Sequence, residues 1–472
     1  MNLLDLPPEI LLIILSFLDR EQDIYTLTLT NKPLSTLANP HLYTNNARKH
    51  NSSALLWAAE HNKQPTAELS LRHGGNINAT DSDGRTPLFW TSWQAHNDLA
   101  RFFLRIGKGK IDVNLKENRG VTPLNYACMQ GNTGIVRMLL ETGKADVNTP
   151  ENGGLTPIGS AAQIGNVPIV TMLLATEGIN VNAADSIFAR APICLAADGG
   201  YADVMRLLLE TGQVDLDDQN WRIQSSFFWA VNWGYEGVVR LFLATGKVDV
   251  NAALPSQGTP PLCQAARNGR VAIVKMFIEF ALDGGGEGSE GEDVQFDIRD
   301  QSCHRTPLGW AALGGHVDVA EVLLSTGRVD IDSRDGVGQT PLSLAAQNGH
   351  TRVVQMLLEA GKKGLGSVSV DPESDLGRTP LSLAAQGGWH AVVKLLIQTG
   401  QADVNAVDSE WRRTPLSWAA GNGHVEVVQL LLATGRADLD SRDGTFQRTA
   451  LEWAAENGYD AVVELLEQQG HE

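Results

Sequence analysis

Acidic pairs of the form Asp-x-Asp recur along the sequence, and they are the first candidates for chemistry because carboxylates at this spacing open calcium-binding loops. Asp330 with Asp332 is one example. A calcium loop also needs an oxygen ligand two residues further on and a glutamate at its twelfth position, but Arg334 and Pro341 occupy those places. We therefore predict that these carboxylates satisfy backbone groups in turns and hold no metal.

The histidines and cysteines indicate no other reactive centre. His316, His350 and His424 follow a glycine at the same offset, which favours hydrogen bonding at a helix start over metal binding. The sequence has no Cys-x-x-Cys pair, Gly-x-Ser-x-Gly elbow, phosphate loop or His-Glu-x-x-His pattern, so we predict no catalysis and no cofactor. The four scattered cysteines favour a reducing compartment, the cytosol or the nucleus, and they are Cys128, Cys194, Cys263 and Cys303.

One repeated unit supplies the elements that position these residues, and it is clearest between residues 413 and 440, RTPLSWAAGNGHVEVVQLLLATGRADLD. Thr414 is placed to cap a short helix that Pro415 starts and Gly423 ends. A second, broadly apolar helix follows and ends at Gly435. The rest of the unit is an extended turn, so the pattern predicts an all-α fold of helix pairs joined by hairpin loops.

This unit, with Thr-Pro-Leu and Ala-Ala at fixed offsets, resembles the ankyrin repeat, which implies a stacked α-solenoid. About twelve copies fill residues 51–472, and the longest step between them holds an acidic, Gly-rich insertion near residues 283–293 that we expect to be mobile. The copies begin at Ser53, Thr86, Thr122, Thr156, Ala191, Ser225, Pro260, Thr306, Thr340, Thr379, Thr414 and Thr449. Tryptophan recurs on the first helix, where we predict partly buried packing, at Trp57, Trp90, Trp229, Trp310, Trp418 and Trp453.

The first fifty residues follow a different pattern. The apolar run from Ile10 to Leu18 is too short to span a bilayer and has no basic flank, so it predicts a soluble helix rather than an anchor or signal peptide. Its apolar side chains cover nearly the whole circumference, which predicts a partner on the far face. We expect two further short helices between Asp23 and Tyr43.

The run Leu-Pro-Pro-Glu-Ile-Leu that starts at Leu6, together with the later Thr-Asn-Lys and Pro-x-Leu-Tyr, resembles an F-box and predicts a three-helix domain over residues 1–50. F-boxes dock on the Skp adaptor of the cullin-type (SCF) ubiquitin ligase. The resemblance implies that the docking residues are Leu6, Pro7, Ile10, Leu11 and Ile14.

Charge narrows the classes of partner. The 37 Lys and Arg against 55 Asp and Glu give a formal charge of −18, which disfavours nucleic acid and anionic membranes because affinity for both comes mainly from basic side chains. We expect a cytoplasmic or nuclear substrate-recruiting adaptor whose ankyrin array holds a protein for ubiquitin transfer. Two alternatives stay open: an interaction scaffold that the N-terminal helices merely cap, and a Skp-bound protein that acts outside ubiquitination.

The resemblance places partner contacts at hairpin tips and at the end of each first helix, where exposed Trp and Arg would dominate the binding energy. The predicted substrate-binding residues are Trp93, Phe188, Trp221, Arg222, Trp233, Trp411, Arg412 and Phe446. For Trp221 and Trp233 the alternative is packing on a neighbouring hairpin. A second candidate is a row of arginines before the first helices, which could attract an acidic segment: Arg85, Arg190, Arg305, Arg378, Arg413 and Arg448.

Overall fold

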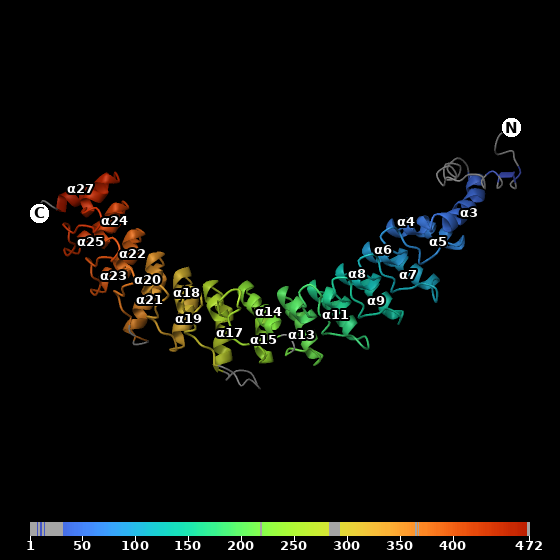
Figure 1. The fold of residues 1–472 in the computed structure, drawn as a ribbon, viewed down its shortest axis with the longest axis horizontal. Coiled ribbons are helices and arrows are strands. Elements are labelled where there is room, and N and C mark those ends of the chain that lie inside the picture. Colours follow the sequence, from blue (N-terminus) through green and yellow to red (C-terminus); the bar gives the residue numbers. More distant parts are fainter. Residues whose placement is uncertain are drawn as a thin grey trace. The chain divides into compact units, whose positions relative to one another are not determined.

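The structure is a computed structural model, which describes residues 32–217, 220–282, 293–363, 366 and 368–469, together with residues 7, 10, 11 and 14. Across these residues every regular element is a helix, from α3 to α27, and none is a strand, so the predicted all-α class is confirmed (Figure 1). The Gly-rich insertion, apart from Asp293, lies outside the described residues. The helices fall into two compact units, Met1–Asp215 and Leu216–Glu472, each of which we describe by itself.

The first helix of unit 1 whose bounds the structure gives is α3, with 18 residues and Pro40 in its interior. It covers the later part of the stretch from Asp23 to Tyr43 in which the sequence predicts two short helices, and residues 23–31 lie outside the described residues. Five helix pairs follow, and the first helices of successive pairs pack on one another. The helices are α3 (Lys32–Lys49), α4 (Ser53–Glu60), α5 (Gln64–Arg72), α6 (Pro87–Trp93), α7 (Asn97–Ile106), α8 (Pro123–Met129), α9 (Thr133–Glu141), α10 (Pro157–Gln163), α11 (Val167–Leu174), α12 (Pro192–Asp198) and α13 (Ala202–Glu210).

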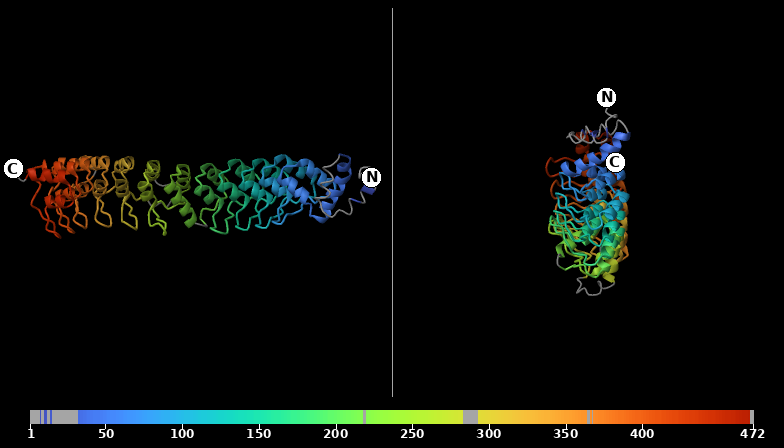
Figure 2. Two further views of the ribbon diagram at one scale, coloured as in Figure 1. Left: turned by 90° about the horizontal axis from the view of Figure 1, so that it is seen from above. Right: turned by 90° about the vertical axis from the view of Figure 1, so that its right-hand side faces the viewer.

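Unit 2 contains seven pairs built in the same way. Its helices are α14 (Asn220–Trp233), α15 (Glu236–Thr245), α16 (Pro261–Arg267), α17 (Val271–Leu282), α18 (Pro307–Gly314), α19 (Val317–Ser325), α20 (Pro341–Gln347), α21 (Thr351–Lys362), α22 (Pro380–Gln386), α23 (His390–Gln398), α24 (Pro415–Gly421), α25 (Val425–Leu432), α26 (Ala450–Glu456) and α27 (Asp460–Gln469). In both units the hairpin loops, here called fingers, project on one side of the helix layers (Figure 2).

Threonine caps set the start of most first helices, as predicted. Thr414, for example, accepts a hydrogen bond from the backbone N–H of Ser417, and Pro415 occupies the first turn. Repeat six is different, because α14 begins at Asn220, five residues before the predicted start at Ser225. A serine pair replaces Thr-Pro there, so no proline interrupts the backbone hydrogen bonds and the helix extends into the place of the finger.

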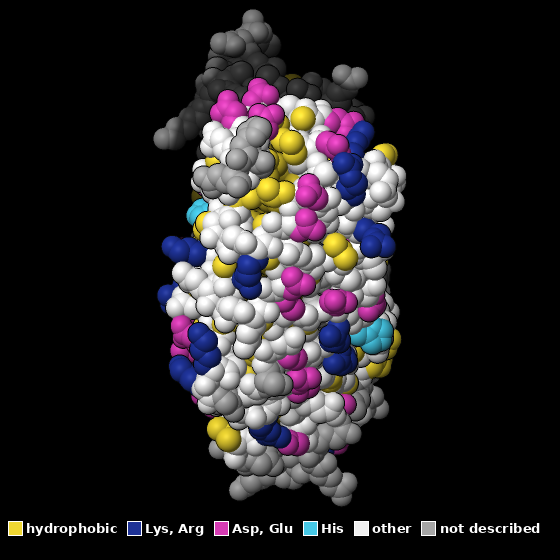
Figure 3. All heavy atoms as spheres, turned by 90° about the vertical axis from the view of Figure 1, so that its left-hand side faces the viewer, with side chains coloured by type: hydrophobic (Ala, Val, Ile, Leu, Met, Phe, Trp, Pro, Cys, Tyr) yellow, Lys and Arg dark blue, Asp and Glu magenta, His cyan; other side chains and the backbone are white. Residues whose placement is uncertain are grey.

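Small residues on the first helices and branched residues on the second helices form the core. In repeat eleven Ala419 and Ala420 are fully buried between neighbouring first helices, and Val427, Val428 and Leu431 are buried beneath them. Alanine lets the short helices approach closely, which is why a seven-residue helix can be part of a stable stack. The last helix, α27, closes the stack with an exposed acidic side, and Figure 3 shows acidic side chains along the middle of this end of unit 2.

Side chains at the base of the fingers form a ladder from repeat to repeat. Asn78 Nδ2 donates to the carbonyl of Lys110 at 2.8 Å, and its Oδ1 accepts the N–H of Asp112 at 2.9 Å. The same two bonds recur at Asn114, Asn148, Asn182, Asn251 and Asn405.

In three fingers of unit 2, an aspartate at this ladder position meets a following finger. Asp297, Asp332 and Asp371 accept the N–H of the next finger, but an ionised carboxylate cannot donate the second bond. Among the described residues the Oδ1 atoms of Asp332 and Asp371 are buried and have no hydrogen-bond partner. Burial raises the pKa of all three carboxyls, and neighbouring carboxylates raise it further.

Candidate protein-binding surfaces

Five of the six recurring tryptophans are buried or half-buried, as predicted, whereas Trp57 is 47% exposed. Four of the five also make a hydrogen bond that the sequence analysis missed. The indole Nε1 of Trp90 donates to Asp81 at 3.0 Å, and that of Trp418 donates to Asp408 at 2.9 Å. Trp310 and Trp453 repeat the arrangement with Asp300 and Asp443. Each acceptor is the first residue of the finger tip, nine or ten positions before the tryptophan. The bond therefore fixes the finger to its own helix.

The arginines before the first helices stack on these indoles. The Arg413 guanidinium lies 4.6 Å from the ring centroid of Trp418 and 3.8 Å from that of Trp453. Arg378 and Arg448 cover the outer faces of the same two rings at 4.7 and 4.8 Å. Burial lowers the pKa of the Arg413 guanidinium, and the nearby carboxylates of Asp443 and Asp408 partly offset this decrease.

Other members of the same row pair with acids: Arg190 with Asp185 at 3.0 Å, and Arg305 with Asp335 at 2.9 Å. These contacts engage the arginine row within the fold, so attraction of an acidic segment stays only a prediction for it.

Three predicted binding residues belong to α14. Trp221 is 65% exposed and Trp233 is 56% exposed, with the guanidinium of Arg222 4.1 Å from the Trp221 ring. Trp233 stacks on Trp229 at 6.3 Å, so its inner face packs within α14 while its outer face meets solvent. Helix α14 therefore carries Trp221 and Arg222 in its first turn and Trp233 at its end, about three helical turns away, and these side chains are here called the aromatic and basic stripe.

The charge around this stripe differs from that of the whole chain. None of the first helices from α14 to α24 contains Asp or Glu, whereas Arg222 and Arg267 lie among them. Among the described residues neither arginine has a carboxylate partner within ion-pair distance. The first helices from α14 to α24 therefore carry basic but no acidic side chains, in a chain with a formal charge of −18.

Two other predicted residues lie near the end of unit 2. Trp411 (37% exposed) and Phe446 (54% exposed) occupy the same tip position of neighbouring fingers, and the N–H of Gly444 donates to the Trp411 carbonyl at 2.8 Å. Phe446 also packs edge-on against Trp453 at 5.6 Å. Arg412 is exposed and has a positive φ of 52°. The same tip position holds Val337 and Leu376, both about half exposed, which sequence reasoning missed although each directly precedes the tip glycine.

The remaining substrate-binding candidates, both in unit 1, are separate. Trp93 is half-buried, stacks on Trp90 at 5.2 Å and lies under Arg85 at 4.7 Å. Phe188 is 58% exposed at the tip of another finger. These two side chains come from repeats two and five, so they do not form one site.

The predicted Skp-docking residues are only partly described, since Leu6 lies outside the described residues. Pro7 is exposed, and its carbonyl accepts the N–H groups of Ile10 and Leu11 at 3.0 and 3.2 Å. Ile10 is 42% exposed, Ile14 is half-buried and Leu11 is only 6% exposed. Among the described members of the set, Pro7 and Ile10 are therefore the exposed apolar side chains.

The structure also locates the histidines that the sequence analysis assigned to helix starts. His316, His350 and His424 are N-cap residues by position, but their side chains make no cap bond. Their Nε2 atoms lie about 3 Å from carbonyl oxygens at the end of the preceding repeat's first helix. This part of the prediction was wrong, because an imidazole reaches the neighbouring repeat more easily than its own first turn.

Within the described ranges, no three His, Cys, Asp or Glu side chains gather in a geometry that would hold a metal ion. None of the described helices combines the length and the hydropathy needed to cross a membrane.

Comparison with known families matches the architecture in two parts. The model for ankyrin repeats (three copies) matches residues 94–185, 227–335, 262–365, 365–443 and 401–472. The F-box-like model matches residues 3–49. Members of these families are typically non-catalytic interaction modules.

Individual relatives match short stretches. Inversin from Mus musculus is 31% identical over 96 residues, which is 19% of this chain and 9% of that protein. An ankyrin repeat protein, FPV031, of Fowlpox virus (strain NVSL) is 35% identical over 94 residues, 19% of this chain and 27% of its own. Transient receptor potential cation channel subfamily A member 1 from Homo sapiens is 26% identical over 154 residues, 32% of this chain and 14% of that protein. The chain thus spans less than a third of these relatives, and with its repeated helix pairs and family match it belongs to the ankyrin-repeat family, with an F-box-like domain at residues 3–49.

Proposed function

We propose that this chain is a non-catalytic, substrate-recruiting adaptor of a cullin-type SCF ubiquitin ligase, in the cytosol or nucleus. Residues 1–50 dock the Skp adaptor, and the array over residues 51–472 holds a protein substrate. The observation that carries the proposal is the F-box-like match at residues 3–49 beside an ankyrin array with exposed Trp221 and Trp233. The F-box supplies the tether, and the aromatic and basic stripe on α14 supplies a contact surface.

The tether is tested by co-expression with the Skp adaptor. Ile10→Glu places a charge on an exposed apolar side chain and should abolish co-purification, because burying an unpaired carboxylate in an apolar contact is costly. Ile106→Glu is the matched control, since Ile106 is similarly exposed, at 50%, at the end of α7. Equal co-purification of the Ile10→Glu variant and the wild type would remove the F-box assignment.

The substrate surface is tested with Trp221→Ala combined with Trp233→Ala. Proteins that co-purify with the intact chain should be depleted, while Trp389→Ala, which removes a 42% exposed indole from the α22–α23 turn, should leave them unchanged. Circular dichroism checks that helix content is kept. Equal capture by the double variant would place the substrate on another surface.

The main alternative is an interaction scaffold in which α3 and the preceding residues only cap the array. Its support is that α3 contacts both α4 and α5. Co-purification of a cullin together with the Skp adaptor separates this scaffold from a ligase adaptor, and ubiquitination of a captured protein separates the adaptor from a Skp-bound protein with another role.

A further inference from the structure

The first repeat lacks a finger. In every other repeat with a tip aspartate and a tryptophan, the finger precedes the first helix, but here α3 runs directly into α4 through a short turn at Asn51 and Ser52. This turn replaces only the base of a finger, because Ser52 Oγ accepts the N–H of Asn76 at 2.9 Å and Asn51 Nδ2 donates to the carbonyl of Thr80 at 2.8 Å. Nothing replaces the tip within the described residues.

The missing tip leaves the indole of Trp57 without its usual acceptor. Trp90, Trp310, Trp418 and Trp453 each donate to a finger aspartate, whereas Trp57 Nε1 has no hydrogen-bond partner in the described part of the chain. Trp57 is also 47% exposed, compared with 6% for Trp310 and 8% for Trp418. Its ring stacks on His61 at 4.6 Å, which holds the indole in place.

A second donor is left open at the tip of the next finger. In the following fingers of unit 1, the N–H groups of Asn118, Asn152 and Ser186 each donate to a tip carbonyl of the preceding finger at 2.9–3.0 Å. Ser82 occupies the same position in the first finger, and among the described residues its N–H donates to no backbone carbonyl. Two donors therefore lack the acceptors that a preceding finger would provide.

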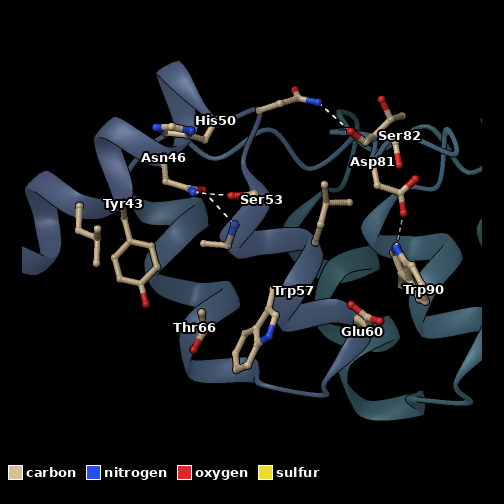
Figure 4. Close-up of a pocket in the computed structure, with 15 residues that line it drawn as sticks. Tyr43, Asn46, His50, Ser53, Trp57, Glu60, Thr66, Asp81, Ser82 and Trp90 are labelled. Carbon is tan, nitrogen blue, oxygen red and sulfur yellow. Dashed lines mark hydrogen bonds between the residues drawn. The ribbon is translucent and has the colours of Figure 1, made fainter. Parts of the chain in front are cut away.

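Both donors border one cleft of about 1110 Å³ between α3, α4 and the first finger. Tyr43 and Asn46 line it from α3, and Trp57, Ser82 and Trp90 line it from the repeats (Figure 4). Asn46 fixes α3 to the start of α4, since its side chain bonds both Ser53 Oγ and the N–H of Ala54. The cleft is thus built on two elements whose separation is set by direct hydrogen bonds.

Two carboxylates line the cleft, and they limit where an acidic ligand can lie. Asp81 accepts three N–H groups, from Trp90, Asp83 and Arg85, at 2.9–3.0 Å, which compensates its charge. Glu60 lies at the other end of α4, next to His61. Neighbouring fingers elsewhere in unit 1 also carry carboxylates, at Glu117 and Glu151. Glu117 accepts the N–H groups of Arg119 and Val121, whereas burial and the charge of Glu117 raise the pKa of Glu151.

We propose that this cleft binds a turn-forming peptide segment of a partner protein that carries an aspartate and takes the place of the missing finger. The aspartate accepts the Trp57 indole N–H, and a backbone carbonyl of the same turn accepts the Ser82 N–H. Asp-x-x-Gly, as in Asp81 to Gly84, is the form of turn that satisfies these two kinds of donor in the first finger, where Asp81 accepts the Trp90 indole N–H and the Asp83 carbonyl accepts the N–H of Asn118. This site does not depend on docking to the Skp adaptor.

The test is a titration of the full chain with a synthetic peptide of the sequence of residues 79–86, followed by nuclear magnetic resonance of the indole protons. We expect the Trp57 indole proton to move most, and a peptide with alanine in place of the residue corresponding to Asp81 to bind at least tenfold more weakly. Trp57→Phe in the protein should weaken binding by a similar factor, whereas Trp453→Phe, whose indole already has Asp443 as acceptor, should not.

A second variant removes the other donor without removing a side-chain contact. Ser82 is the second residue of a turn closed by the N–H of Gly84 on the carbonyl of Asp81, a position that suits proline, so Ser82→Pro deletes the N–H and keeps the turn. It should also weaken peptide binding. An unmoved Trp57 resonance at millimolar peptide overturns the proposal. So does slow hydrogen exchange of the Trp57 indole and the Ser82 amide in the free full chain, because the protein's own residues would then fill the cleft.

Discussion

The ladder of finger side chains makes a quantitative prediction about Asp297, Asp332 and Asp371. Replacing each with asparagine adds the donor that Asn251 and Asn405 use at the same position, where Nδ2 reaches a carbonyl of the next finger at 3.1 and 2.8 Å. A hydrogen bond of this kind contributes about 0.5–1.5 kcal/mol net, so the triple variant should gain roughly 1.5–4.5 kcal/mol at pH 7. Urea unfolding of the full chain, followed by circular dichroism, measures the gain as a higher midpoint.

The sign of the pH dependence provides an independent check. The pKa of each carboxyl is raised in the folded protein, mainly by burial, so the folded state binds protons more tightly than the unfolded chain. Stability from these groups is therefore present below the ordinary aspartate pKa of about 4 and is lost as pH rises through the folded value. The benefit of asparagine should accordingly be larger at pH 7 than at pH 4.

The chain offers its own reverse control. Asn405→Asp converts a complete rung into the aspartate form, so it should lower the free energy of unfolding at pH 7 by about 0.5–1.5 kcal/mol. The reasoning would be refuted if the triple variant were no more stable than the wild type at pH 7, or if its gain were the same at both pH values. An Asn405→Asp variant with an unchanged free energy of unfolding at pH 7 would also refute the reasoning.

Three further predictions concern single sites. Gly421→Gln should raise the free energy of unfolding by about 1 kcal/mol in urea, because Arg413 Nη2 is buried without a partner among the described residues and the new amide can accept its hydrogen bond. The equivalent residue of the preceding repeat, Gln386, accepts such a bond from Arg378 at 2.7 Å. No gain would mean that the longer side chain does not fit beside Arg413. Trp418→Phe should lower the free energy of unfolding by about 1–3 kcal/mol, because the buried Asp408 carboxylate loses the indole donor. Trp57→Phe should lower it much less, and equal losses would contradict the role of the indole bond. Ala189→Gly should raise the free energy of unfolding by about 0.5–1 kcal/mol, measured as a higher thermal midpoint, because Ala189 has a φ of 47°, a backbone conformation that glycine adopts without strain. A lower midpoint would show that this backbone is not strained.

Sequence reasoning predicted the helices well where one residue type controls the backbone. Thr-Pro places a cap and a first turn with little freedom, so the starts at Thr306, Thr340 and Thr414 were correct. At Ser225 the same logic failed, since the local signal was weak and buried Ile223 and Phe227 stabilise the longer helix through contacts that no local pattern encodes.

The finger contacts were harder to predict because they join residues more than thirty positions apart. The Asn78 rung to Lys110 and Asp112 depends on how far one repeat is displaced from the next. The indole bonds did have a signal, since an aspartate stands ten residues before Trp310, Trp418 and Trp453. The candidate sites could be located as exposed aromatic positions, but which of them come together depends on the backbone, as the α14 extension shows.

The finger-tip bonds give the array a chemical direction. From Asn118 to Ser186 in unit 1, and from Gln301 to Gly444 in unit 2, the tip N–H groups donate to a carbonyl of the finger before them. Among the described residues, the Ser82 N–H of the first finger therefore lacks a backbone acceptor, and the Phe446 carbonyl of the last finger lacks a backbone donor. Surfaces that are complementary at opposite ends can polymerise head to tail into open filaments. Helix α3 packs on α4 and α5, and α27 with its acidic side chains packs on α25 and α26, so we expect removal of either helix to favour head-to-tail association.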